Sequence, residues 1–125
     1  MGRHAQLGRD GEDVAAAFVE RLGWRVLARN WRPADHALRG ELDIVALDGD
    51  ALVLCEVKTR SGTGAGVPAA AVHPRKLGQL RRLAGAWLAE HPQARHRVIR
   101  IDVLGLVWVP GAVAPTIAHH RDVGR

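Results

Sequence analysis

The sequence predicts a single mixed α/β domain whose elements follow the order helix, three strands, helix, strand. Three observations support this prediction. The chain has 125 residues, which suits one domain with a real core and is too short for two. Hydrophobic residues make up 47% of the chain and charged residues 25%, the ordinary composition of a globular protein. Helical and strand-like hydrophobic periodicities also alternate along the chain.

The first two predicted elements are a helix and a strand. Asp10 is a good N-cap, and apolar residues recur after it at helical spacing. We therefore predict a helix from about residue 10 to Leu22 that stops at Gly23. The next segment predicts a strand, because its side chains alternate between two sets, Trp24, Val26 and Ala28 on one face and Arg25, Leu27 and Arg29 on the other. Residues 31–39 are predicted to form a loop.

The remaining predicted elements begin with a central hairpin. Residues 42–47 and 51–59 are strong strand signals joined by a short turn. Residues 61–66 carry three glycines and are predicted to be mobile. Pro74 suits the first turn of a second helix, which should end near residue 90. Residues 97–109 are predicted to form the last core strand, either as one long strand or as two broken at Gly105, so the core spans about residues 8–109. The tail, residues 110–125, is expected to be loosely structured apart from a short strand at 116–118.

Charge is distributed unevenly along the chain. Residues 1–62 hold 9 basic and 10 acidic side chains, whereas residues 63–125 hold 9 basic and only 3 acidic ones. The net charge of +5 and the basic second half favour a polyanionic partner, with nucleic acid first. The single cysteine, Cys55, excludes an internal disulfide framework and is expected to be a small buried hydrophobe. With neither a signal-peptide pattern nor a long apolar stretch, we expect a cytoplasmic protein without a membrane partner.

Two carboxylates on the hairpin are the most informative residues. A two-residue turn at Gly49-Asp50 places Asp43 directly opposite Glu56, as does a four-residue loop, whereas a three-residue loop places Asp43 opposite Cys55. Facing carboxylates between apolar strands repel each other and lose hydration, so they need compensation. Mg²⁺ or Mn²⁺ would supply it.

Lys58 shares the strand face of Glu56, because side chains two residues apart point the same way. A lysine there can stabilise charge that develops on a phosphate. The alternative is that Asp43, Glu56 and Lys58 form only a salt-bridged surface of the sheet.

These residues resemble the motif of a known protein superfamily. Asp43, followed on the adjacent strand by Glu56-Val-Lys58, resembles the PD-(D/E)XK nuclease superfamily, although Leu42 stands where the superfamily's name has proline. The chain as a whole resembles the bacterial YraN family over roughly residues 8–104. The matching stretches are Gly11-Glu12, Leu27–Asn30, Gly40–Asp43, Glu56–Arg60, Lys76 and Arg100–Val103. The resemblance implies a restriction-endonuclease-like fold, with a central mixed β-sheet flanked by helices, akin to archaeal Holliday junction resolvases.

The resemblance also implies a metal-dependent phosphodiesterase. Asp43, Glu56 and the backbone carbonyl of Val57 would hold Mg²⁺ or Mn²⁺. Lys58 would orient the attacking water or stabilise the transition state. Glu12 matches a helix glutamate that related nucleases often add, but it could equally favour the positive end of the helix dipole. Glu41 faces the same side as Asp43 and is either a further ligand or a strand-edge charge.

A candidate nucleic-acid surface lies on the second predicted helix. A polar stripe runs beside the buried one, and with Arg60 it would form a phosphate track made of Arg75, Lys76, Gln79 and Arg82. The alternative is a solvated helix face. Lys76 and Gln79 could also reach the catalytic face, as helix residues do in some related nucleases. Among the tryptophans, Trp31 is the candidate for stacking on bases, whereas Trp87 is expected in the core. Arg100 and Asp102 are expected to pair within the sheet.

The preferred hypothesis is a Mg²⁺- or Mn²⁺-dependent DNA endonuclease, with branched or single-stranded DNA among its candidate substrates. An enzyme that cuts two strands of a branched structure is expected to be a homodimer. The alternative is a non-catalytic module that keeps the nuclease-like fold and binds nucleic acid or protein. A third hypothesis is a purely structural α/β domain whose basic surface reflects an arginine-rich composition.

Overall fold

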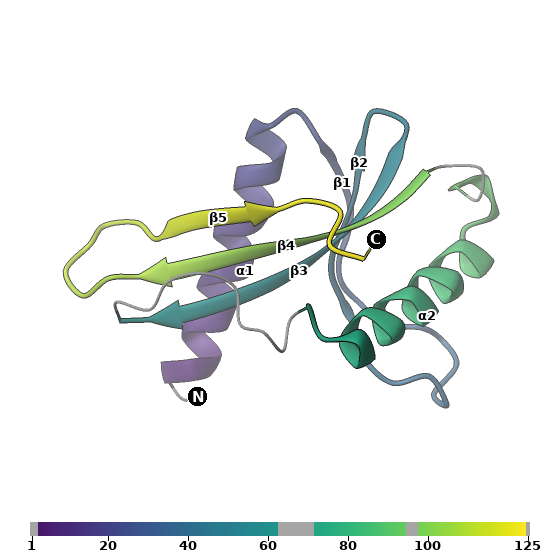
Figure 1. Cartoon of the computed structure of the whole chain (residues 1–125), viewed down its shortest axis with the longest axis horizontal. Helices are drawn as coiled ribbons and strands as arrows, with labels where there is room; N and C mark the ends of the chain where they lie inside the picture. The colour runs from purple at the N-terminus through teal and green to yellow at the C-terminus, as the bar shows by residue number, and fades with distance from the viewer. Residues whose placement is uncertain (1–2, 63–71, 95–97, 125) are drawn as a thin grey trace.

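A mixed β-sheet organises the fold (Figure 1). The computed structural model describes residues 3–62, 72–94 and 98–124. Within these residues, five strands form one sheet in the order β1-β2-β3-β4-β5. The β3–β4 pair is parallel, and the other three pairs are antiparallel. The elements are α1 (Arg3–Arg21), β1 (Arg25–Trp31), β2 (Leu42–Asp48), β3 (Ala51–Ser61), α2 (Pro74–Glu90), the short 3-10 helix η2 (Pro92–Ala94), β4 (Val98–Trp108) and β5 (Thr116–His120).

The two long helices cover opposite faces of the sheet. In Figure 1, α1 passes behind the strands and α2 lies apart from it at the right of the sheet. Ala15 and Val19 of α1 pack with Cys55 and other residues on one face, and Leu80 and Trp87 of α2 pack on the other. The central strands β2 and β3 are thus buried on both sides, which explains their nearly continuous apolar sequence. This arrangement confirms the predicted α/β class and the buried Cys55.

The β2–β3 hairpin has the predicted register. Asp48 pairs with Ala51 and Ile44 pairs with Cys55, so the loop between the strands is the two-residue turn Gly49-Asp50. Gly49 has φ +56°, a left-handed conformation that glycine adopts without steric cost. The described pairing of β2 with β3 ends at Ile44 and Cys55, and one residue further the Val57 amide donates to the carboxylate of Asp43 at 2.8 Å, so the direct pairing of Asp43 with Glu56 stays a prediction.

Helix α1 begins earlier than predicted. It starts at Arg3, so Asp10 lies inside the helix and is not its N-cap. The capping pattern at Asp10 is therefore a coincidence of sequence, because residues 3–9 continue the same helix. Helix α2 matches the prediction, with Pro74 as its first residue and His73 as its N-cap.

Strand β1 does not alternate as predicted. The register shifts between Val26 and Ala28, which places a β-bulge at Leu27. As a result, Val26 packs with the α1-side core, whereas Leu27 and Ala28 both pack with the α2-side core. The predicted assignment of Ala28 to the face of Val26 is wrong, because one extra residue reverses the faces that follow it.

The tail is more ordered than predicted. Residues Thr116–His120 form β5, two residues longer than the expected short strand, and pair antiparallel with β4. Beyond β5, the amide of Val123 donates to the carbonyl of Ile101 at 2.8 Å. The expectation of a loosely structured tail is wrong for this segment, because backbone and side-chain bonds hold it to β4.

Two further predictions concern the glycine-rich segment and the membrane. Of the glycine-rich segment predicted to be mobile, residues 63–66 lie outside the described residues. Within the described part of the chain, neither α1 nor α2 combines the length and apolarity that a membrane crossing requires.

Candidate functional site

The candidate site forms on β2 and β3, beside the middle of α1 and the first turn of α2. Asp43 follows the α2-side pattern of Val45, and Glu56 follows that of Leu54, so both carboxylates belong to the same face of the sheet. Glu12 reaches the same region from α1, and Glu41 reaches it from the segment just before β2. The structure therefore gathers acidic side chains from three parts of the chain.

Asp43 is the most perturbed carboxyl group of this site. Its side chain is only 9% exposed, and its Oδ2 accepts a hydrogen bond from the Val57 amide at 2.8 Å. The pKa of Asp43 is raised to about 7, chiefly by burial and next by the neighbouring charge of Glu56, while the Val57 hydrogen bond partly opposes both effects. The charges of Glu12 and Glu41 also raise this pKa. A nearby cation would favour the ionised form of this carboxyl group.

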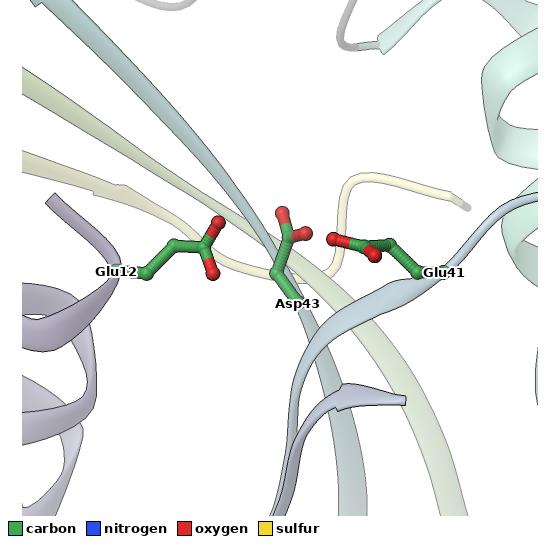
Figure 2. Close-up of side chains that lie close together, drawn as sticks. All are labelled: Glu12, Glu41 and Asp43. Atoms are coloured by element: carbon green, nitrogen blue, oxygen red, sulfur yellow. The ribbon is translucent and has the colours of Figure 1, made fainter. Parts of the chain in front are cut away.

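Asp43 lies between two glutamates in an acidic cluster, defined here as Glu12, Glu41 and Asp43. One carboxylate oxygen of each residue lies within 4.8 Å of those of the other two. Figure 2 shows the three side chains pointing toward one another, with Asp43 in the middle. Like charges this close repel each other, so the arrangement is suited to a cation that accepts hard oxygen ligands.

Asn30 holds two members of the acidic cluster and was missed as a site residue. Its side-chain amide donates to Glu12, and also to Oε1 of Glu41 at 3.3 Å. Asn30 has φ +50°, a conformation that asparagine tolerates better than most residues. The other oxygen of Glu41 accepts from Arg32 Nε at 3.1 Å. An asparagine at the end of a predicted strand was the only sequence signal for this contact.

Glu56 is buried in a different electrostatic environment. It is 5% exposed, and its Oε1 lies 3.2 Å from Lys58 Nζ while its Oε2 lies 3.5 Å from Lys76 Nζ. Two ammonium groups therefore compensate the burial of this carboxylate. The predicted neighbourhood of Glu56 and Lys58 is present, and the contact with Lys76 adds a residue from α2.

The donor set of the site fits a divalent metal ion. Carboxylates of Glu12, Glu41 and Asp43 converge, and oxygen ligands of this kind suit Mg²⁺ and Mn²⁺. The ligand set predicted from the sequence was Asp43, Glu56 and the carbonyl of Val57. Asp43 is common to both sets, whereas the role of the Val57 carbonyl and of Glu56 as ligands stays a prediction.

The predicted nucleic-acid residues of α2 line one surface hollow. Its walls comprise His73, Arg75, Lys76, Gln79 and Arg82, and its volume is about 470 Å³. Arg60, the remaining residue of the predicted phosphate track, lies on β3, is partly exposed and is not among the described residues that line the hollow. The stripe inferred from helical spacing therefore exists as a basic concave surface beside Glu56.

Two further predictions concern Trp31 and the pair of Arg100 with Asp102. Trp31, the candidate for base stacking, packs into the α2-side core with its ring 5.3 Å from that of Trp87. Trp31 is only partly buried, so its stacking on bases stays a prediction. The expected pair of Arg100 with Asp102 is present, with Arg100 Nε 2.9 Å from Asp102 Oδ1.

Comparison with known proteins gives a consistent family match. The sequence model described as "Uncharacterised protein family UPF0102" matches residues 11–106. A UPF0102 protein of Streptomyces griseus is 49% identical over 98% of this chain and 99% of its own length. A second UPF0102 protein, from Frankia casuarinae, is 51% identical over 92% of each chain, and one from Parafrankia sp. is 54% identical over 81% of each.

Proposed function

Since the chain belongs to the uncharacterised protein family UPF0102 (YraN), within the restriction-endonuclease-like superfamily, we propose that it is a Mg²⁺- or Mn²⁺-dependent DNA endonuclease. One observation carries the proposal. The buried carboxyl of Asp43 has its pKa raised to about 7 and lies among the carboxylates of Glu12 and Glu41. Such a group is expected where a cation completes the site.

Each residue of the site has a distinct proposed role. The acidic cluster holds the cation, with Glu56 as a further candidate ligand. When bound, the cation supplies Lewis acidity toward a phosphodiester and toward water. Lys58, whose ammonium lies 3.2 Å from Glu56 Oε1 and whose side chain is 38% exposed, stabilises the charge that develops on the phosphate.

The proposed substrate is DNA that lies along the basic hollow of α2. Arg75 and Arg82 line this hollow, and Lys76 joins it to Glu56. Arg60 on β3 extends the basic surface. Branched and single-stranded DNA are the substrate structures that we propose to test first, and paired cuts in a branch would require a homodimer.

A nicking assay tests the proposal. We expect purified protein with Mn²⁺ or Mg²⁺ to cut supercoiled, single-stranded or four-way-junction DNA. Asp43→Asn, Glu56→Gln and Lys58→Gln should each lower the rate about a hundredfold or more, because each removes a ligand or a charge at the phosphate. Glu20→Gln is the matched control, since Glu20 is an exposed carboxylate at the far end of α1. Cleavage that persists in Asp43→Asn would identify a contaminant and contradict the proposal.

The alternative of a non-catalytic module has one observation in its favour. Lys58 and Lys76 already compensate the charge of Glu56, so this carboxylate is stable without a metal ion. A binding module would retain DNA in a salt-sensitive manner and cut none of the substrates. Retention measured at several salt concentrations, alongside the nicking assay, separates the two functions.

A further inference from the structure

Resting on the proposed function, we propose that Lys76 couples phosphate binding to cation binding. A backbone phosphate of the nucleic acid binds in the basic hollow of α2 and attracts the ammonium of Lys76. The ammonium then leaves Oε2 of Glu56, and this oxygen becomes free to bind the cation held by Asp43. The site therefore binds its metal ion more tightly when a phosphate is present.

The hollow has the charge and size for a phosphate group. Three of the five described residues that line it are basic, Arg75, Lys76 and Arg82, and the other two are His73 and Gln79. Its volume of about 470 Å³ leaves room for a tetrahedral oxyanion. Nδ1 of His73 already accepts the Arg75 amide at 3.1 Å, so the side-chain cations, rather than that amide, bind the anion.

Lys76 lies between the hollow and the acidic site. Its Nζ is 3.5 Å from Glu56 Oε2 and 3.3 Å from Gln79 Oε1, and its side chain is 29% exposed. Gln79 is itself anchored, because its Nε2 donates to the Arg39 carbonyl at 3.2 Å. The ammonium is thus in contact with both sites and needs only a rotation of its flexible side chain to move between them.

The second lysine makes the exchange possible. When Lys76 turns toward a phosphate, Lys58 still lies 3.2 Å from Oε1 of Glu56, so the buried carboxylate keeps one counter-charge. In contrast, Lys76 and a metal ion compete directly for Oε2. Because coupling between two ligands is reciprocal, a bound cation should also strengthen phosphate binding in the hollow.

The test measures Mn²⁺ binding by calorimetry and by thermal shift, without any cleavage readout. Sulfate serves as the phosphate probe, with chloride at equal ionic strength as its control. We expect sulfate to tighten Mn²⁺ binding to the unmodified protein by about fivefold or more. Lys76→Gln should bind Mn²⁺ more tightly even without sulfate, and sulfate should add nothing further.

Two control variants separate the coupling from simple charge effects. Lys76→Arg keeps the positive charge and should restore the sulfate effect. Arg82→Gln weakens the hollow but leaves the contact of Lys76 with Glu56 in place, so sulfate should no longer tighten Mn²⁺ binding in this variant. A sulfate effect that survives in Lys76→Gln, or an unchanged basal Mn²⁺ affinity in that variant, would overturn the coupling while leaving the proposed function intact. Absence of Mn²⁺ binding in every variant would overturn both.

Discussion

At the residue scale, two buried carboxylates on adjacent strands have opposite surroundings. Glu56 is held between the ammonium groups of Lys58 and Lys76, whereas Asp43 has acidic neighbours and one backbone hydrogen bond. Burial without a counter-charge favours the protonated form of a carboxyl group. Asp43 is therefore a group that the fold tolerates at a cost to stability, which is expected of a functional residue rather than a structural one.

This cost predicts how stability depends on pH. Asp43 has a pKa of about 7 in the folded protein and 3.8 as the unperturbed value, so between these limits the folded state binds more protons than the unfolded state. The free energy of unfolding should thus fall as the pH rises from 4 to 7. Asp43→Asn should remove up to ~4 kcal/mol of this fall and make the protein more stable than the original at pH 8. Urea unfolding at pH 5 and pH 8 measures the effect.

A divalent cation provides the complementary measurement. Mn²⁺ should raise the melting temperature of the unmodified protein at pH 8, because it relieves the repulsion among Glu12, Glu41 and Asp43, and it should do so less in Asp43→Asn. Glu20→Gln should behave like the unmodified protein in both experiments. An Asp43→Asn variant that is less stable than the unmodified protein at pH 8 would show that the ionised carboxylate stabilises the fold, and would contradict this prediction.

Sequence reasoning reached part of this site. The shared face of Asp43 and Glu56 was predictable, because the side-chain period of a strand is two and the turn Gly49-Asp50 fixes the register. The sequence also suggested that Lys76 could reach this face from the second helix, but its contact with Oε2 of Glu56 was not predictable, since it joins residues that are 20 positions apart through the packing of α2. The bridging role of Asn30 depends on a positive φ, which periodicity does not reveal.

At the element scale, the approach of α1 to β3 depends on one glycine. A Cβ atom at Gly11 would lie 2.0 Å from Oγ1 of Thr59 and 2.9 Å from its Cγ2, far inside normal contact. Glycine therefore lets the helix lie close to the strand and bring Glu12 to the acidic cluster. Elsewhere in a helix, glycine is a poor choice, because alanine is favoured by about 1 kcal/mol.

Two alanine substitutions in helices should consequently have opposite effects. Gly11→Ala should destabilise the protein by about 1–3 kcal/mol and displace Glu12, because Thr59 and the strand must move. Gly85→Ala in α2 should stabilise it by about 0.5–1 kcal/mol, since no atom lies within 4 Å of a Cβ there. Chemical denaturation gives both values. Equal effects of the two substitutions would contradict the packing argument.

The elements that sequence patterns predicted best are those with strong local signals. Helix α2 has a proline at its first residue and an apolar stripe at helical spacing, and it was placed within a residue at both ends. The bulge at Leu27 was not predicted because both faces of the sheet are covered by helices. The apolar residues Val26 and Leu27 therefore suit either face, and the sequence does not show where the alternation shifts. The early start of α1 escaped because Asp10 mimics a cap.

At the scale of the whole molecule, Asp102 ties the tail to the sheet. It is fully buried on β4, and it accepts hydrogen bonds from Arg100 and from the amide of Asp122, while His119 Nε2 of β5 lies 2.8 Å from its Oδ2. Burial alone would raise the pKa of Asp102, but the hydrogen bonds from Arg100, Asp122 and His119 outweigh it and lower that pKa. Arg100 in turn contacts Asp48 at the end of β2 at 3.1 Å.

Removing this carboxylate should destabilise the whole fold. Asp102→Ala leaves Arg100, whose side chain is 17% exposed, without its main partner, and should lower the free energy of unfolding at pH 7 by about 3–5 kcal/mol. Because the pKa of Asp102 is lowered by folding, its contribution is present above pH 4 and is lost as the pH falls below its unfolded value of 3.8. Denaturation at pH 7 and pH 3 should therefore show a smaller effect at pH 3.

A surface ion pair provides the control for the Asp102→Ala substitution. Asp13→Asn breaks the pair between Asp13 and Arg29, two exposed side chains, and should cost less than about 1 kcal/mol at either pH. If Asp102→Ala costs no more than Asp13→Asn, the bonds to β5 and the tail do not stabilise the fold. The tail's order was unpredictable from its own sequence, because its partners lie on β4.

The parallel pairing of β3 with β4 has a consequence for how the chain folds. Residues 25–61 form an antiparallel meander of neighbouring strands, whereas Ala51 of β3 finds its parallel partner in Val98, 47 positions further along the chain. Closing so long a loop is slow compared with forming a hairpin. We therefore expect the meander to form early in the folding reaction, and α2 with β4 to dock late. Substitutions in the β2–β3 hairpin should slow folding, and those in β4 should mainly accelerate unfolding.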